Sequence, residues 1–322
     1  MRRMRNALAI VAPTLLLLNT AAAQNFPDRT VKIIVPTAPG GSIDATARIL
    51  GEKLQAQWGK PVIIENRAGA GMRIGADAAA KSPADGYTWL VAHDGTMAMN
   101  AVIYRDLPYD PVKDFVPLGL ISAIPEVIMV ANKVPAKTLA EFIAYAKNNP
   151  GKVNHATGGT ATLLAAELLK AMAGIEIEHV TYRGGAPAVT GLMSGDVEVA
   201  IADIATANAA LQSDRVRPLA VTTLARVSQY PGLPTADEAG VPGFDVATWI
   251  GAFAPAGTPK EVVDKIEAGI RNAIKEPDVR AKLEQIGMQP RSGTADELRD
   301  VLANDIAKWG KLVREKDIKI AQ

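Results

Sequence analysis

Residues 31–57, VKIIVPTAPGGSIDATARILGEKLQAQ, join an apolar run, a glycine-rich turn and an apolar pattern with helical spacing. The β-branched run Val31–Val35 predicts a buried strand, and Ile43–Gln57 predicts a helix that starts just after Pro39-Gly40-Gly41. The first backbone N–H groups of such a helix, and the positive end of its dipole, are open to a ligand. This stretch therefore predicts a strand–turn–helix unit that can hold an anion without a basic side chain.

The same order of strand, glycine turn and helix occurs in further segments of the chain. Alternating strands and helices predict doubly wound α/β sheets. One group of units precedes residue 110 and the other follows residue 150, so we expect one sheet in each of two lobes. The glycine turns of these other units are Gly69-Ala70-Gly71, Gly158-Gly159 and Gly184-Gly185.

Proline-punctuated connections separate the two groups of units. Leu107–Pro111 and Pro231–Pro242 cannot be helical, and they imply that the chain crosses between the lobes twice. We expect closure of the lobes to be a hinge motion near residues 120–127 and 243–252. The predicted lobes are residues 24–124 together with 248–322, and residues 125–247.

The beginning of the chain has the pattern of a secretory signal peptide. Arginines among the first five residues precede the apolar stretch Ala7–Leu18, and Ala21-Ala22-Ala23 matches an A-x-A cleavage site. The apolar stretch is shorter than the roughly 20 residues that span a bilayer. We therefore interpret residues 1–23 as a cleaved signal peptide and expect the mature protein in the periplasm.

Composition narrows the class of protein. The chain has 35 Lys and Arg against 34 Asp and Glu, and this balance of charge does not favour a nucleic-acid partner. It has no cysteine, so it forms no disulfides. The segment Gly69–Gly75 has its third glycine one residue late for a dinucleotide fingerprint. The three histidines lack the spacing of metal ligands, and no hydrolase or kinase motif occurs. We expect a monomer without metal, cofactor or enzymatic activity.

Thr-x-x-Glu sequences predict helix starts in the C-terminal part of the chain, at Thr258–Glu261 and at Thr294–Glu297. Apolar residues at helical spacing follow both, among them Ile266, Ile270 and Trp309. We expect these stripes to be packing surfaces.

Two glycine turns, one in each predicted lobe, are the candidates for binding a carboxylate. Glycine is suited to this role because a side chain there would block the ligand. The alternative is that Ser42 only caps a helix and Asp44 only compensates its dipole. The residues predicted to bind are Ala38, Gly40, Gly41, Ser42 and Asp44 in the first lobe, and Gly159, Thr160 and Ala161 in the second.

Side chains near the predicted cleft supply the remaining candidates. Arg73, at a helix start, can clamp a second carboxylate with its guanidinium fork, or it can be an ordinary solvated or salt-bridged arginine. His93 and Thr96, at a strand end, can line the pocket or serve structure alone. Asp203 can hold an amine or hydroxyl of the ligand, or it can cap the helix that follows it.

Short motifs occur in a fixed order over the whole mature chain: Phe26-Pro27, Pro39-Gly40-Gly41 with Asp44, Glu65-Asn66-Arg67, Asp85–Thr88, Leu107–Pro111, Tyr182-Arg183-Gly184 and Trp249–Pro259. Together they resemble the periplasmic receptor of the tripartite tricarboxylate transporter family, called Bug receptors in bordetellae. The resemblance implies a type II periplasmic-binding-protein fold, with two doubly wound lobes joined by two crossover strands and a ligand cleft between them. It also implies a small mono- or dicarboxylate ligand, aliphatic or aromatic, and the membrane subunits of a secondary transporter as partners.

The chain departs from the family pattern at two places. Met72 stands where the family usually has a third glycine, and Leu163 stands where a histidine commonly follows the second-lobe glycine turn. Both departures fall in the expected pocket, so the identity of the carboxylate stays open.

A sensory receptor that signals to a membrane kinase is the alternative function, and an exported enzyme is disfavoured because no nucleophile–base set is present.

Overall fold

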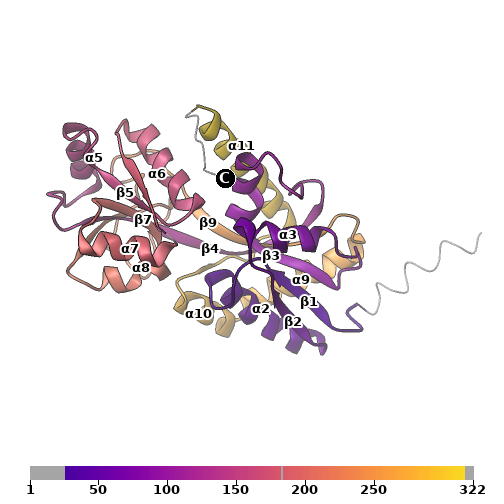
Figure 1. Ribbon diagram of the computed structural model, residues 1–322. Helices are drawn as coiled ribbons and strands as arrows, with labels where there is room; N and C mark the ends of the chain where they lie inside the picture. Colours follow the sequence, from indigo (N-terminus) through magenta and orange to yellow (C-terminus); the bar gives the residue numbers. More distant parts are fainter. Residues whose placement is uncertain (1–25, 183, 316–322) are drawn as a thin grey trace, which may run out of the picture.

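The structure is a computed structural model that describes residues 26–182 and 184–315, and these form two lobes (Figure 1). The predicted signal peptide, residues 1–23, lies outside the described residues, as do Arg183 and residues 316–322 of the predicted first lobe. The described strands form one sheet whose main order is β2-β1-β3-β9-β4-β7-β5-β6. The sheet continues from one lobe into the other, so a shared backbone framework joins them.

The first lobe is built on parallel strands with one antiparallel neighbour. β1 (Val31–Val35) pairs with β2 (Val62–Asn66) and β3 (Thr88–His93), and β9 (Ala247–Pro255) runs antiparallel to β3. The carboxyl ends of the three parallel strands therefore share one edge of the sheet. The helices and short elements of this lobe are α2 (Ser42–Trp58), η1 (Ala70–Met72), α3 (Arg73–Ala80), the π-helical turn η2 (Gly95–Met99), α4 (Asn100–Ile103), α9 (Lys260–Lys275), α10 (Pro277–Gln285), β10 (Gln289–Pro290) and α11 (Ala295–Glu315).

The second lobe repeats this plan. β5 (Asn154–Thr157) lies between β6 (Glu178–Thr181) and β7 (Val199–Asp203) and is parallel to both. The carboxyl ends of these strands lead into helices, as the sequence predicts. The helices are α5 (Leu139–Asn148), α6 (Thr160–Ala173), α7 (Gly185–Ser194) and α8 (Ile204–Leu211), and β8 (Val216–Val221) completes the lobe.

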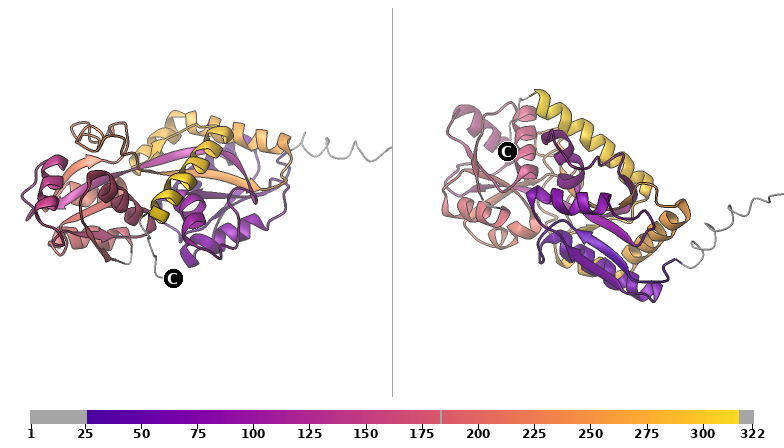
Figure 2. Two further views of the ribbon diagram at one scale, coloured as in Figure 1. Left: turned by 90° about the horizontal axis from the view of Figure 1, so that it is seen from above. Right: turned by 45° about the vertical axis from the view of Figure 1, so that its right-hand side comes forward.

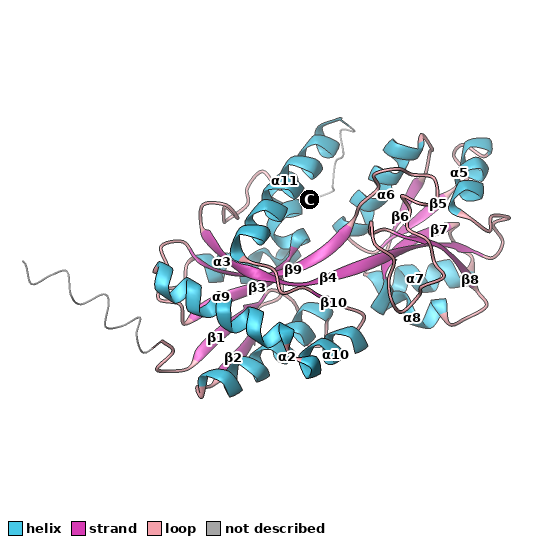
Figure 3. Ribbon diagram, turned by 180° about the vertical axis from the view of Figure 1, so that it is seen from behind, coloured by secondary structure: helices cyan, strands magenta, loops and turns pink. Residues whose placement is uncertain are grey.

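One long strand, β4 (Phe115–Ala131), runs through both lobes (Figure 3). It pairs with β9 as far as Pro125 opposite Ala247, and with β7 from Glu126 opposite Asp203. The backbone amide of Val246 donates to Thr222, whose own amide donates to Glu126, so the returning chain is tied to β4 at the same point. The change of pairing partners therefore falls at a single peptide of β4.

Apolar helix faces cover both sides of the first-lobe sheet (Figure 3). Leu50 and Leu54 of α2 and Ile266 and Ile270 of α9 are fully buried on one side, and Trp309 of α11 is buried on the other. The C-terminal stripes are thus packing surfaces, as predicted.

The lobes also touch beside the strands that join them. Figure 2 shows α11 running to the side of α6, and these two helices are in contact. α6 also contacts η2 at the end of β3. On one side of the strands that join the lobes, the space between the lobes is therefore filled by α6, α11 and η2.

Candidate functional site

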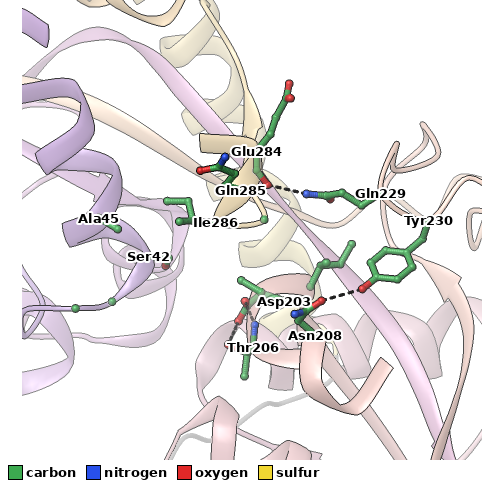
Figure 4. A pocket seen from close by; sticks show the side chains of 15 residues that line it. Ser42, Ala45, Asp203, Thr206, Asn208, Gln229, Tyr230, Glu284, Gln285 and Ile286 are labelled. Carbon is green, nitrogen blue, oxygen red and sulfur yellow. Dashed lines mark hydrogen bonds between the residues drawn. The ribbon is translucent and has the colours of Figure 1, made fainter. Parts of the chain in front are cut away.

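A pocket of about 680 Å³ lies between the lobes (Figure 4). The first lobe contributes the turn before α2, with Gly40, Gly41 and Ser42, and the second contributes the start of α8, with Asp203 and Thr206. Segments far apart in the sequence thus meet at one place. The sequence predicted Gly40, Gly41, Ser42 and Asp203 as ligand-binding residues, and the structure brings these four together here.

The turn before α2 is held in place by Asp44, which is buried and does not line the pocket. Its carboxylate accepts hydrogen bonds from the Gly40 amide at 2.8 Å, the Arg48 Nε at 2.9 Å and the Asn66 Nδ2 at 2.9 Å. Burial alone would raise the pKa of Asp44, but these hydrogen bonds bring it below its ordinary value. Asn66 also donates to the Thr37 carbonyl at 3.0 Å. Asp44 therefore fixes the turn that contributes Gly40, Gly41 and Ser42 to the pocket, whereas Ala38, just before this turn, is exposed and does not line the pocket.

Two of the helices that follow parallel strands, α2 and α6, begin after glycine. α2 and α6 follow Gly41 and Gly159, and no described side chain caps either helix. By contrast, Thr138 caps α5, which lies away from the pocket. The first amides of α2 and α6 are consequently available to an anion.

The second-lobe glycine turn lies at the sheet edge but not in the pocket wall. A Cβ on Gly158 would lie 2.7 Å from the Gly185 backbone, so glycine is required where these two turns pack together. Thr162 accepts from the Gly158 amide at 3.1 Å and donates to the Gly159 carbonyl at 3.0 Å. Gly159 is exposed, and Thr160 and Ala161 are partly exposed. These three predicted residues do not line the 680 Å³ pocket.

His93 and Thr96 form a compact cluster at the end of β3. The His93 Nδ1 accepts from the Thr96 amide at 3.1 Å, and burial lowers the pKa of His93 to about 4, so the ring is neutral. Thr96 is fully buried, and its hydroxyl contacts the Met72 sulfur at 3.2 Å. Neither residue lines the pocket. These contacts agree with the alternative in which His93 and Thr96 serve structure alone.

Arg73 is directed toward a neighbour in its own lobe. Its Nε donates to the Ala70 carbonyl at 2.7 Å, and its guanidinium carbon lies 4.0 Å from the centre of the Tyr104 ring. It does not line the pocket. Ala70 and Met72 on either side of Gly71 have positive φ angles of 47° and 72°, a backbone that favours glycine. The segment where the chain departs from the family pattern is thus conformationally strained.

Asp203 lines the pocket and also caps α8. Its two carboxylate oxygens accept from the Thr206 amide at 2.8 Å and the Thr206 hydroxyl at 2.6 Å. The predicted cap is therefore present, and each oxygen keeps lone-pair capacity for a further donor.

Sequence reasoning missed the residues that close the far side of the pocket. Gln229 of the second lobe donates from Nε2 to the Glu284 carbonyl of the first at 2.8 Å, and the Tyr230 hydroxyl donates to Asn208 at 3.1 Å (Figure 4). Gly287 in the turn after α10 packs so closely on α8 that a Cβ would lie 3.0 Å from Ala205. Gln229 and Glu284 lie in segments without a periodic or motif signal. No pattern in the sequence predicts their place in the pocket.

The described residues contain no cluster of three or more side chains suited to holding a metal ion. The same part of the chain has no helix with the length and apolarity needed to cross a membrane.

Comparison with known proteins gives a consistent result. Residues 46–318 match the model of a family described as the tripartite tricarboxylate transporter family receptor. A relative from Pseudomonas sp. strain P51, a UPF0065 protein in the tcbD-tcbE intergenic region, is 40% identical over 90% of this chain and 87% of its own.

Two solved structures share the fold. An R. palustris protein with adipate has a TM-score of 0.79 and 35% identity over 90% of this chain and 97% of its own. MatC from Rhodopseudomonas palustris with bound malate has a TM-score of 0.75 and 33% identity over 89% of this chain and all of its own, 100%. The predicted fold class is confirmed.

Proposed function

Because the chain belongs to the tripartite tricarboxylate transporter receptor family, we propose that it is an extracytoplasmic receptor for one small carboxylate. It binds this ligand between its lobes and delivers it to the membrane subunits of a secondary transporter. The observation that carries the proposal is the pocket in which the glycine start of α2 faces the start of α8. The carboxylates in the two related structures, adipate and malate, support the same ligand class.

The carboxylate is held mainly by backbone in this proposal. The Gly40 amide is bonded to Asp44, so the amides left for a ligand are those of Gly41 and of the first turn of α2 from Ser42 onward, where the helix dipole favours negative charge. Asp44 fixes this turn from behind, so little ordering remains to be done when the ligand binds.

Closure of the cleft brings the second-lobe turn into contact with the ligand. We place the hinge at residues 120–127 and 243–252, between lobes formed by residues 24–124 with 248–322 and residues 125–247. Gly159, Thr160 and Ala161 at the open edge then approach the start of α2 and add the amides of α6. His93 and Thr96 at the end of β3, and Arg73 at the start of α3, lie behind this closed site and support it through contacts inside the first lobe.

The test is a melting-temperature screen of the mature protein against aliphatic, aromatic and amino-acid carboxylates, with adipate and malate included. At 100 times Kd a ligand adds about 2.7 kcal/mol to stability. For a chain of this size that raises the melting temperature by several degrees. A matched set of neutral amides and of sugars should give no shift. A panel in which no carboxylate raises the melting temperature would overturn the proposed ligand class.

Transport and location need separate measurements. N-terminal sequencing of protein recovered from a periplasmic extract should begin near Gln24, as expected for a cleaved signal peptide. Deleting the gene should abolish uptake of the bound carboxylate by whole cells, and the cleaved receptor should restore it. Normal uptake with a lost transcriptional response would favour the sensory alternative.

A further inference from the structure

Glu126 occupies the position on β4 where the strand leaves the first-lobe pairing and begins to pair with β7. Its partner across the strands is Asp203, which lines the pocket. Residues paired in this way point to the same face of the sheet, with Cβ atoms about 5 Å apart. The Glu126 carboxyl group therefore lies beside Asp203 and behind the pocket wall, and Glu126 itself does not line the pocket.

The Glu126 side chain is almost entirely buried, with 3% of the residue exposed. Its Oε1 has one distant partner, the Thr248 hydroxyl at 3.5 Å, and its Oε2 has no hydrogen-bond partner among the described residues. A buried carboxyl group without partners is costly when charged. This group is accordingly suited to the neutral form, in which it carries a proton that can be donated.

The charged groups around Glu126 come from several elements. Asp203 of β7 raises the pKa of Glu126, and Lys308 of α11 lowers it. Asp94, at the end of β3, is itself buried and senses both Glu126 and the Asp305 carboxyl group of α11. Acidic groups thus outnumber the single amine. Burial first, and then Asp203, raise the pKa of Glu126 to about 8.

We propose that Glu126, from behind Asp203, makes binding proton-dependent, so that the cleft accepts a carboxylate only while Glu126 is protonated. An ionised Glu126 would add negative charge directly behind the pocket wall and repel an anionic ligand, whereas the neutral acid adds none. At any pH at which Glu126 is ionised in the ligand-free receptor, binding of a carboxylate therefore takes up a proton. This inference rests on the proposed function and adds a proton to the bound complex.

The proton uptake can be measured by calorimetry with adipate and malate, in pairs of buffers that differ in ionisation enthalpy. Both acids are fully ionised above pH 7, so they supply no proton themselves. At pH 8 about half of the free receptor is ionised at Glu126, so we expect uptake of up to about 0.5 proton per ligand, and about 0.1 at pH 7. The apparent affinity should be about tenfold weaker at pH 9 than at pH 7.

Two variants assign the proton. Glu126→Gln should show no uptake, and its affinity should differ by less than about twofold between pH 7 and pH 9. Asp94→Asn removes the other strongly buried acid and should keep the uptake. If Glu126→Gln does not fold, carbon NMR of the wild-type glutamate carboxyl groups replaces it. One of these carboxyl groups should titrate near pH 8, and its pKa should rise when adipate is added.

Each outcome decides a different point. If adipate or malate binds without proton uptake, or with release, the role of Glu126 is overturned and the carboxylate receptor stands. Uptake that persists in Glu126→Gln, or that is lost in Asp94→Asn alone, also overturns it. If no carboxylate of the panel raises the melting temperature, the proposed function fails first, and this inference fails with it.

Discussion

Replacing Asp44 by alanine should destabilise the receptor and weaken binding together, because one buried carboxylate orders the turn that faces the ligand. Arg48 is 52% exposed, so its ion pair contributes about 0–1 kcal/mol. The bonds from Gly40 and Asn66 to a charged acceptor contribute about 1.5–3 kcal/mol each, reduced where water reaches Gly40. We therefore expect Asp44→Ala to lower the free energy of unfolding by about 2–4 kcal/mol.

Chemical denaturation and calorimetry test both parts of this prediction. With the turn loosened, about 1.4 kcal/mol of ordering must come from binding, so the Kd for adipate or malate should rise by roughly tenfold. Arg48→Ala is the matched control and should cost no more than about 1 kcal/mol. The pKa of Asp44 is depressed in the folded state, so its contribution is present above the ordinary aspartate range and is lost as the pH falls through the folded pKa. An Asp44→Ala receptor whose stability lies within about 0.5 kcal/mol of wild type would contradict a role of Asp44 in ordering the turn, since that is the range of a plain surface substitution.

Three further predictions concern Arg73, the hinge and a buried histidine. Arg73→Ala should cost about 0.5–1 kcal/mol of stability through its loss of stacking on Tyr104, measured by denaturation. A tenfold loss of affinity confined to dicarboxylates would instead place Arg73 in the closed cleft. Small-angle scattering should give a smaller radius of gyration at saturating adipate or malate, and unchanged curves would contradict a hinge. Burial and His179 lower the pKa of His155 to about 3, so the neutral ring contributes stability that is present above about pH 6.5 and is lost as the pH falls toward 3. The stability difference between wild type and His155→Gln should accordingly shrink from pH 7 to pH 4.5, and a constant difference would be inconsistent with this assignment.

Local sequence signals were sufficient for the fold. The strand, glycine turn and helix at residues 31–57 became β1 and α2, and Gly158-Gly159 likewise leads from β5 into α6. Thr294 and Glu297 form the predicted capping box, with bonds of 3.1 Å and 2.7 Å between amide and side chain. The same prediction was wrong at Thr258, whose hydroxyl donates to the Pro255 carbonyl at 2.8 Å. α9 begins at Lys260 with Pro259 as its N-cap, so Thr258 lies one residue before the capping position.

The candidate site could be predicted only in part, because its contacts depend on segments distant in the chain. The glycine turn at Gly40 predicts an open helix start. Residue spacing cannot predict that the Asp44 carboxylate accepts from both the Gly40 amide and Asn66, because Asn66 lies on β2, distant in the sequence. Gln229 reaches the pocket because the loop after β8 lies against the last turn of α10, where Gln229 donates to the Glu284 carbonyl. Glu126 carried a usable signal, a lone carboxylate inside the apolar stretch of residues 118–131. Such an isolated acid in a buried strand marks a site worth examining.

The position of β9 sets the order in which this chain can fold during its synthesis. β9 lies between β3 and β4, so the first-lobe sheet has a gap until residue 255 has left the ribosome. β4 meanwhile lacks the neighbour it pairs with along most of its first-lobe half. Such sequence-distant pairing is slow to form. A newly made chain therefore cannot complete its first-lobe sheet until most of its length has been synthesised, so the two halves of the sheet must wait for a strand encoded far downstream.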